Sequence, residues 1–192
     1  MNKLLGVVLC GGASRRMGRD KGLIEREGVP WAIRMGEKLT PWSLPVVYSI
    51  NAKQQAAYTA ILSPAQLITD TLELPGPLNG LFSVHERYPD HDLLLLACDM
   101  PDLDDKALRK IIDLYLGGRG GEGAPAFYVY RDAHFLQPFC AIYTAAGLRP
   151  MHLLIRTGGL QDTSLQALLK SGSSRQTVIT DFASFHNYNT PE

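Results

Sequence analysis

The sequence contains few cysteines, and their positions exclude several kinds of site. Its three cysteines, Cys10, Cys98 and Cys140, form no C-x-x-C motif and no pattern with histidine that would suit zinc. An odd number also disfavours the disulfide framework that stabilises many small secreted domains. We therefore expect reduced thiols and a cytoplasmic protein.

Net charge and long hydrophobic runs are also missing. Lysine plus arginine and aspartate plus glutamate number 19 each, so the formal net charge is zero and no overall field attracts nucleic acid or an anionic membrane. No apolar run approaches the roughly 18 residues of a membrane helix, and the short run at 4–10 meets glycines instead of continuing as a signal peptide. We expect neither nucleic acid nor a membrane as a partner, and we expect residues 1–192 to form a single domain.

Several familiar catalytic and nucleotide-binding signatures are absent as well. The histidines form no i,i+4 pair, and the nucleophile elbow that a catalytic triad needs is missing. Within the glycine-rich segment 9–22, the P-loop pattern fails because Arg19 follows Gly18, where a P-loop requires lysine. The dinucleotide pattern G-x-G-x-x-G fails in this segment too, so a nucleotide site here must belong to another class.

The most informative segment that is present is this same loop, which reads LCGGASRRMGRDK at residues 9–21. Its glycines Gly11 and Gly12 let backbone N–H groups approach an anion closely. Four basic side chains follow them, namely Arg15, Arg16, Arg19 and Lys21. We interpret the loop as a binding site for the phosphates of a nucleoside triphosphate, with Arg16 and Lys21 as its most important cations.

Apolar runs that are typical of strands alternate with segments that are typical of helices. The predicted strands are 4–9, 45–50, 66–69 and 93–97, and the predicted helices are 31–39 (ended by Pro41), 54–62, 81–88 and one capped by Asp102 or Asp104. The runs 4–9 and 93–97 are apolar throughout, as in strands that are buried on both faces of a parallel sheet.

The second part of the chain is less regular. The predicted elements are a pair of strands at 126–130 and 135–143, helices near 151–155 and 164–169, and a strand at 177–180. The whole pattern predicts an α/β fold of three layers, α/β/α, with a mostly parallel, Rossmann-like central sheet plus a small antiparallel hairpin. In such a fold, ligands bind in the crevice at the carboxyl ends of the strands.

Polar residues follow three of the predicted strands. Asp99 comes after the run of leucines, where a carboxylate near triphosphate oxygens would suit Mg²⁺; its alternative role is to cap a turn before Pro101. Asp70 is either an acceptor for a base or ribose, or a turn cap. Ser49 and Asn51 offer a hydroxyl and an amide that can bind the edge of a base.

Four motifs, in this order, resemble those of the MobA-type molybdenum cofactor guanylyltransferases, which are nucleotidyltransferases with a GT-A-like fold. The loop resembles the family's L-A-G-G-x-S-x-R-M-G-x-D-K signature, and residues 76–80 resemble its G-P-L-x-G. Residues 98–101 resemble its C-D-x-P, and residues 187–192 its N-x-N-T-P-E. The resemblance covers nearly the whole chain. It departs at Cys10 and Asn79, where alanine is usual, and at Glu192, beyond which many members continue into a helix.

The resemblance implies transfer of GMP from GTP to molybdopterin carrying molybdenum, with release of pyrophosphate and with Mg²⁺ as cofactor. The residues that it assigns to the nucleotide are Leu9, Cys10, Gly11, Gly12, Lys21, Asn51, Asp70 and Asp99, and those that it assigns to the molybdopterin side are Asn187 and Asn189. Catalysis would rest on Arg16, Lys21 and the metal ligand Asp99. The protein partners that it suggests are apo-molybdoenzymes or their chaperones.

Three alternative functions remain at this point. A related enzyme would use CTP on the same pterin, although such relatives tend to carry Ala-Gly where this chain has Gly11 and Gly12. Another enzyme would act on a sugar phosphate, but the segment Asn187-Tyr188-Asn189 near the end of the chain argues against a sugar acceptor. The third is a non-catalytic nucleotide-binding module, which would not need both Lys21 and Asp99.

Overall fold

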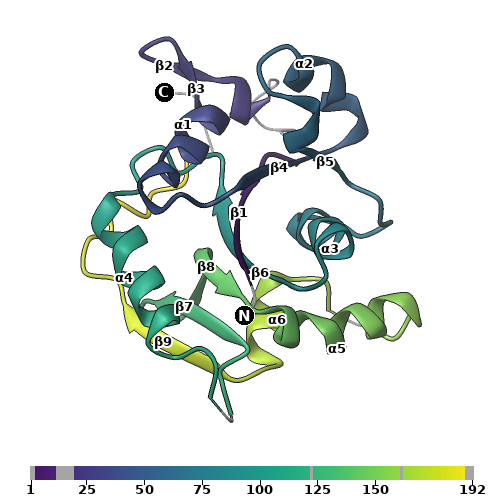
Figure 1. The fold of residues 1–192 in the computed structure, drawn as a ribbon, viewed down its shortest axis with the longest axis vertical. Coiled ribbons are helices and arrows are strands. Elements are labelled where there is room, and N and C mark those ends of the chain that lie inside the picture. The colour runs from purple at the N-terminus through teal and green to yellow at the C-terminus, as the bar shows by residue number, and fades with distance from the viewer. Residues whose placement is uncertain (1–2, 12–19, 122, 161, 189–192) are drawn as a thin grey trace.

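The central feature of the fold is a seven-stranded sheet with helices on both sides (Figure 1). The computed structural model describes residues 3–11, 20–121, 123–160 and 162–188. The strands of the sheet are β1 (Lys3–Leu9), β4 (Val46–Ile50), β5 (Leu67–Thr69), β6 (His91–Ala97), β7 (Phe127–Arg131), β8 (Leu136–Tyr143) and β9 (Ser174–Val178). The α-helices are α1 (Trp31–Glu37), α2 (Gln55–Thr59), α3 (Pro77–Arg87), α4 (Asp105–Leu116), α5 (Ala145–Arg156) and α6 (Leu165–Lys170).

The strand order is β5-β4-β1-β6-β8-β7-β9. Neighbours from β5 to β6 are parallel, β8 is antiparallel to both β6 and β7, and β9 is parallel to β7. The predicted three-layer fold with a mostly parallel sheet is therefore confirmed. The predicted antiparallel pair is present as β7 and β8, but it lies within the main sheet because β8 also pairs with β6.

A separate two-stranded sheet was not predicted. It joins β2 (Glu25–Arg26) to β3 (Val29–Pro30) through Glu27 and Gly28, which both have positive φ angles, 56° and 76°. Two left-handed residues in succession are typical of the tight hairpin turn whose twist matches that of its strands. Glutamate is an unusual residue at a position with a positive φ angle, so the sequence did not predict this turn.

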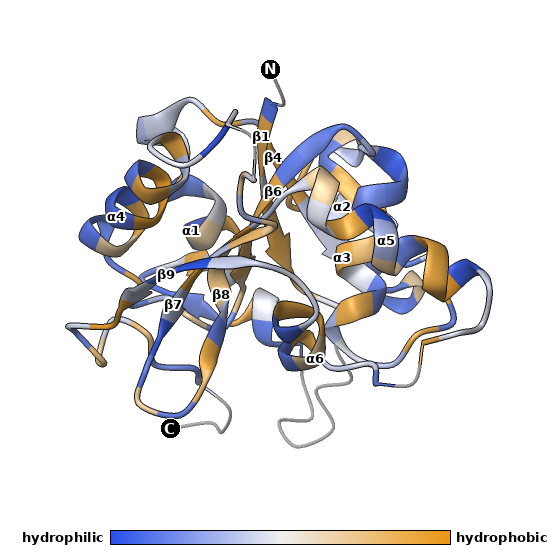
Figure 2. Ribbon diagram, turned by 90° about the horizontal axis from the view of Figure 1, so that it is seen from below, coloured by the Kyte–Doolittle hydropathy of each residue, from blue (hydrophilic) through white to orange (hydrophobic). Residues whose placement is uncertain are grey.

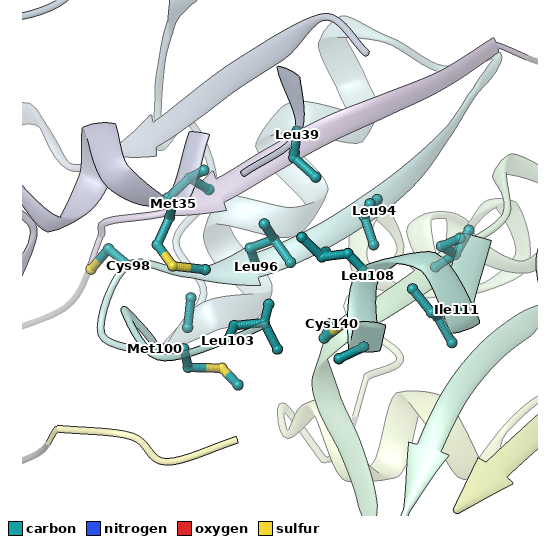
Figure 3. Packing of buried hydrophobic residues seen from close by; sticks show 14 of the residues in the cluster. Met35, Leu39, Leu94, Leu96, Cys98, Met100, Leu103, Leu108, Ile111 and Cys140 are labelled. Atoms are coloured by element: carbon teal, nitrogen blue, oxygen red, sulfur yellow. The ribbon is translucent and has the colours of Figure 1, made fainter. Parts of the chain in front are cut away.

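Each face of the sheet has its own hydrophobic core. Side chains alternate along β6, so that Leu94 and Leu96 pack against α1 and α4 whereas Leu93 and Leu95 pack against α3, α5 and α6. Figure 3 shows the first of these cores, with Met35 of α1 and Leu108 of α4 close to the β6 leucines. In Figure 2 the central strands are hydrophobic along most of their length, while α4 is hydrophobic on one side only. Burial on both faces explains the uninterrupted apolar runs of β1 and β6.

Several helix boundaries differ from those predicted. Helix α4 starts after Asp104, whose side chain accepts a hydrogen bond from the backbone of Ala107 at 2.7 Å, so Asp104 rather than Asp102 is its cap. Helix α3 starts at Pro77, earlier than predicted, because proline suits a first helical turn. Helix α1 ends at Glu37, and Pro41 lies in the following 3₁₀ turn, η2 (Thr40–Trp42).

The remaining differences lie in shorter or less regular elements. Helix α2 covers only part of 54–62, since Gln54 belongs to a preceding 3₁₀ turn, η3 (Ala52–Gln54). Helix α5 begins at Ala145, well before 151, because Thr144 caps it. Strand β9 begins at Ser174; its polar residues lie at a sheet edge, where backbone pairing needs no apolar pattern. Further 3₁₀ turns are η1 (Lys21–Leu23) and η4 (Pro64–Gln66).

Among the described residues, none of the helices has both the length and the apolar character needed to span a membrane.

Candidate functional site

The carboxyl ends of the parallel strands bring most of the predicted site residues together. Leu9, the last residue of β1, is in register with Ser49 of β4 and with Ala97 of β6. Beyond the paired strands, the backbone N–H groups of Cys10 and Gly11 both donate to the carbonyl of Ser49, at 2.9 and 3.0 Å. The Cys98 N–H donates to the carbonyl of Leu9 at 3.1 Å. The carboxyl ends of β1, β4 and β6 therefore lie together beside the first described residues of the glycine-rich loop.

Gly11 lies directly against Asp70, which follows β5. A Cβ atom on Gly11 would be 3.2 Å from Oδ2 of Asp70 and 3.7 Å from the backbone nitrogen of Asn51. The Ser49 hydroxyl donates to Oδ1 of Asp70 at 3.1 Å. Burial raises the pKa of Asp70 above its ordinary value of 3.8, and the hydrogen bond from Ser49 opposes that shift.

Ser49 and Asn51 differ in what they can offer a ligand. Ser49 is fully buried beneath Asp70, so the prediction that its hydroxyl binds a base is wrong; it supports the carboxylate instead. Asn51 caps η3, since its Oδ1 accepts from the Lys53 N–H at 3.0 Å. The side-chain oxygen of Asn51 thus already accepts a hydrogen bond from the backbone, and the side-chain NH₂ group is the donor that Asn51 can offer to a base.

The 76–80 motif holds helix α3 close to these strand ends. Gly76 adopts φ 67°, which favours glycine, and lies just before the helix. A Cβ atom on Gly80 would lie 2.3 Å from the Ser49 hydroxyl and 2.9 Å from Cδ2 of Leu9, so the close approach requires glycine. Asn79, where the resemblance predicts alanine, donates to the carbonyl of Leu72 and accepts from its N–H.

Lys21 and Asp99 form an ion pair at the end of β6. Nζ of Lys21 lies 2.7 Å from Oδ2 of Asp99, and the two side chains are only 18% and 15% exposed. The contact joins residues 78 positions apart in the sequence. The strongest cation candidate from the loop and the predicted metal ligand are therefore neighbours in space.

The C-terminal segment crosses the same region. The backbone N–H of Tyr188 donates to the carbonyl of Asp99 at 3.0 Å. Its hydroxyl donates to Asp102, which also pairs with Arg26, and the two interactions lower the pKa of Asp102. Its ring packs against those of Trp31 and His186, with centroids 5.5 and 4.6 Å away. These contacts bring Asn187, the neighbour of Tyr188 in the chain, to the edge of the site.

The sequence did not predict a role in the site for Asp20, Gln54 or Tyr58. Asp20 accepts hydrogen bonds from the side chains of Gln54 and Tyr58, at 2.5 and 3.1 Å. The only signal was the aspartate within the loop motif, because Gln54 and Tyr58 look like ordinary residues of a helix. Five of the predicted site residues and basic loop residues lie outside the described residues: Gly12, Arg15, Arg16, Arg19 and Asn189.

The donor set suits a metal that arrives with a nucleotide. In the described parts of the chain, no group of three or more histidine, cysteine, aspartate or glutamate side chains could hold a metal ion. Mg²⁺ is commonly bound by one or two carboxylates together with substrate phosphates rather than by a cage of protein ligands. A single hard oxygen donor from Asp99, next to the loop that is predicted to bind phosphates, fits that pattern.

A separate cavity lies at the opposite end of the sheet. Its volume is about 710 Å³, and Asp92, Tyr115 and Thr144 are among its lining residues. The Asp92 carboxylate accepts from the Tyr115 hydroxyl and from the Ala145 N–H, both at 2.8 Å. This carboxylate thus ties β6 to α4 and α5, and none of the predicted site residues that the structure describes lines the cavity.

Comparison with known proteins identifies the family of the chain. Residues 6–177 match the family described as the MobA-like NTP transferase domain. The chain belongs to this family. It is therefore a nucleotidyltransferase, as the four motifs predicted, and the matched range contains Lys21, Asp70 and Asp99.

Relatives of this MobA-like enzyme cover almost its whole length. A molybdenum cofactor guanylyltransferase from Pseudomonas putida (strain GB-1) is 29% identical over 97% of this chain and 93% of its own. One from Pseudomonas paraeruginosa is 31% identical over 97% of this chain and 90% of its own. The crystal structure of molybdopterin-guanine dinucleotide biosynthesis protein A from Archaeoglobus fulgidus has a TM-score of 0.75 at 20% identity, covering 97% of this chain and 92% of that one, and it supports the fold.

Proposed function

We propose that this MobA-like enzyme transfers GMP from GTP to molybdopterin carrying molybdenum and releases pyrophosphate. The observation that carries the proposal is the Lys21–Asp99 ion pair, at 2.7 Å, beside the start of the glycine-rich loop. A cation for phosphate and a carboxylate for Mg²⁺ lie together at the strand ends where α/β proteins bind ligands. The names of the relatives support GTP and molybdopterin as the substrates.

Each group of the site has a role in this reaction. The backbone of Leu9, Cys10 and Gly11 would bind the nucleotide, while Asn51 and Asp70 hold its base and ribose. A carboxylate at Asp70 can accept from adjacent N–H donors, which guanine presents on its N1 and N2 atoms. The Asp70 carboxylate beside Gly11 therefore supports a preference for a purine that carries such donors.

The transfer step needs no nucleophile from the protein. An oxygen of the molybdopterin phosphate attacks the α-phosphorus of GTP, the bond from that phosphorus to the bridging oxygen breaks, and pyrophosphate leaves. Lys21, joined by Arg16, would stabilise the negative charge on the leaving group. When bound at Asp99, Mg²⁺ would neutralise further charge on the phosphates. Asn187 and Asn189 would lie toward the pterin.

The ion pair also implies an exchange of partners when the nucleotide binds. Lys21 and Asp99 neutralise each other across 2.7 Å, so neither charge is buried without compensation. A phosphate oxygen can replace Asp99 as the partner of Lys21, while the freed carboxylate becomes a metal ligand. Both charges thus reach their roles by a short movement of side chains.

The biochemical setting follows from the same proposal. We propose that residues 1–192 act as one nucleotidyltransferase domain in the cytoplasm. The product would pass to apo-molybdoenzymes or to their chaperones.

A single assay separates the proposed function from its alternatives. The protein is incubated with each of the four nucleoside triphosphates, Mg²⁺ and molybdopterin, and pyrophosphate and product mass are measured. We expect product only, or predominantly, with GTP. Product with CTP would support the cytidylyl alternative, product only when a sugar phosphate replaces the pterin would support that acceptor, and nucleotide binding without any product would support a non-catalytic module.

Asp70→Asn should make the protein more stable and less active. A raised pKa means that folding disfavours the charged carboxylate. The contribution of Asp70 to the free energy of unfolding is therefore most favourable below pH 3.8, the ordinary pKa, where the carboxyl group is protonated. It is lost as pH rises through the folded-state pKa. Asparagine carries no charge and still accepts from Ser49. Urea unfolding should therefore show a gain in stability at neutral pH that shrinks as pH falls through the folded-state pKa of Asp70 and is gone below pH 3.8. The same variant should use GTP less well, and equal activity would remove Asp70 from the nucleotide site.

A further inference from the structure

The side chain of Gln54 connects Cys10, near the start of the glycine-rich loop, to Asp20, near its end. Its Nε2 donates to the carbonyl of Cys10 at 3.0 Å and to Oδ2 of Asp20 at 2.5 Å. Its Oε1 accepts from the backbone N–H of Asn51 at 2.8 Å. Gln54 is 9% exposed. One buried amide therefore joins the end of β1, the end of β4 and the residue that precedes Lys21.

Asp20 is held from a second direction by Tyr58. The other carboxylate oxygen, Oδ1, accepts from the Gly22 N–H at 3.0 Å and from the Tyr58 hydroxyl at 3.1 Å. Burial raises the pKa of Tyr58 well above its ordinary value, so the hydroxyl stays protonated and donates. A Cβ atom on Gly22 would lie only 2.1 Å from that hydroxyl oxygen, so glycine at position 22 gives Tyr58 the room to reach Asp20.

We propose that Gln54 is a positioning residue, which holds Asp20 against the end of β1 and so places Lys21 beside Asp99. This inference rests on the proposed function, because it assigns Lys21 to the phosphates. The side chain acts through Asp20 and Lys21 and need not touch a substrate. Only an amide meets the requirement, since its nitrogen donates to two oxygens while its own oxygen accepts from Asn51.

Gln54→Glu tests this role with almost no change of shape. The introduced carboxylate has no N–H to donate, and it would face two oxygen atoms, those of the Cys10 carbonyl and of Asp20. We expect kcat for pyrophosphate release to fall about 10- to 100-fold, which is the scale of a misplaced reacting group. Gln55→Glu is the matched control, because Oε1 of Gln55 accepts from Thr69 at 2.8 Å and a carboxylate can still accept there. The control should keep the wild-type kcat, and an equal loss in both variants would overturn the inference.

A double-mutant cycle distinguishes positioning from general destabilisation. If Gln54 acts through Lys21, Gln54→Glu should cause little further loss of kcat in a Lys21→Ala background. Two independent losses that multiply would overturn the inference.

Should Gln54→Glu fail to give a folded protein, as judged by thermal unfolding, Tyr58→Phe loosens Asp20 by removing one hydroxyl group. We expect about a two- to tenfold loss of kcat from that variant, the scale of one hydrogen bond, and an unchanged kcat would overturn the inference.

Failure of the proposed function can be recognised separately. If the wild-type protein releases no pyrophosphate from GTP with molybdopterin, the proposed function is wrong. The inference is then decided by calorimetric titration of the folded proteins with each nucleoside triphosphate and Mg²⁺. Weaker binding by Gln54→Glu than by Gln55→Glu would support a role in positioning the phosphate-binding lysine. Equal binding by the two variants, or none by the wild type, would overturn it.

Discussion

Asp99→Asn is expected to lower GTP-dependent pyrophosphate release by about 100- to 1,000-fold, the scale of removing one preorganised electrostatic contact at a reacting centre. Asparagine has nearly the same shape, so the backbone contact between the Asp99 carbonyl and Tyr188 should persist. It carries no charge, however, and a neutral oxygen is a weaker ligand for Mg²⁺. Rates measured across a Mg²⁺ titration should show that the variant needs more metal for its residual activity.

The control for this variant is Asp105→Asn. Asp105 is the first residue of α4 and is exposed, so its replacement removes the same charge without changing the ends of the strands. Asp105→Asn should keep the wild-type rate and metal dependence. If Asp99→Asn did the same, Asp99 would have no place in the proposed site.

Lys21→Ala should cause a loss of similar size, about 100- to 1,000-fold in the rate of pyrophosphate release, but with a different response to metal. The ammonium group is proposed to stabilise the leaving pyrophosphate, and no neutral side chain replaces that charge. The same group lies 2.7 Å from the Asp99 carboxylate, so its removal should also free Asp99 of a competing cation. We therefore expect tighter binding of Mn²⁺ or Mg²⁺ in the absence of nucleotide, together with slower transfer.

Lys106→Ala provides the comparison, since Lys106 is an exposed lysine on α4. It should change neither the rate nor the affinity for metal. Isothermal titration with Mn²⁺ alone, followed by the pyrophosphate assay, measures both properties on one sample. A Lys21→Ala variant with normal turnover would contradict the role assigned to Lys21.

The central sheet could be predicted because its sequence pattern has a simple physical cause. Residues 4–9 of β1 and 93–97 of β6 lie between the two hydrophobic cores, so they are apolar throughout, and the polar residues that follow them mark the strand ends. Edge strand β9 and the β2–β3 hairpin carry no such requirement, and their boundaries or existence were missed. Local patterns also could not show that Thr144 starts α5 before its more apolar half.

The site was predictable in its members but less so in their interactions. Asp70 and Asp99 stand out because each follows an apolar strand, yet the ion pair of Asp99 with Lys21 depends on the tertiary fold. Ser49 was assigned wrongly because a serine at a strand end looks the same whether it faces a ligand or lies beneath a carboxylate. Gln54 contacts Asp20 across 34 positions of sequence, and no local pattern distinguishes it from a surface glutamine.

The contact between Tyr188 and Asp99 gives the protein an order of assembly during its synthesis. The parallel half of the sheet, from β5 to β6, consists of residues made by position 97, and a ribosome releases the chain from its N-terminus. The hydrogen bond from Tyr188 to the Asp99 carbonyl has to wait until nearly the whole chain has emerged. A chain interrupted before residue 188 therefore contains Lys21, Asp70 and Asp99 but lacks this contact, so the residues that we propose for the nucleotide are made before the contact can form.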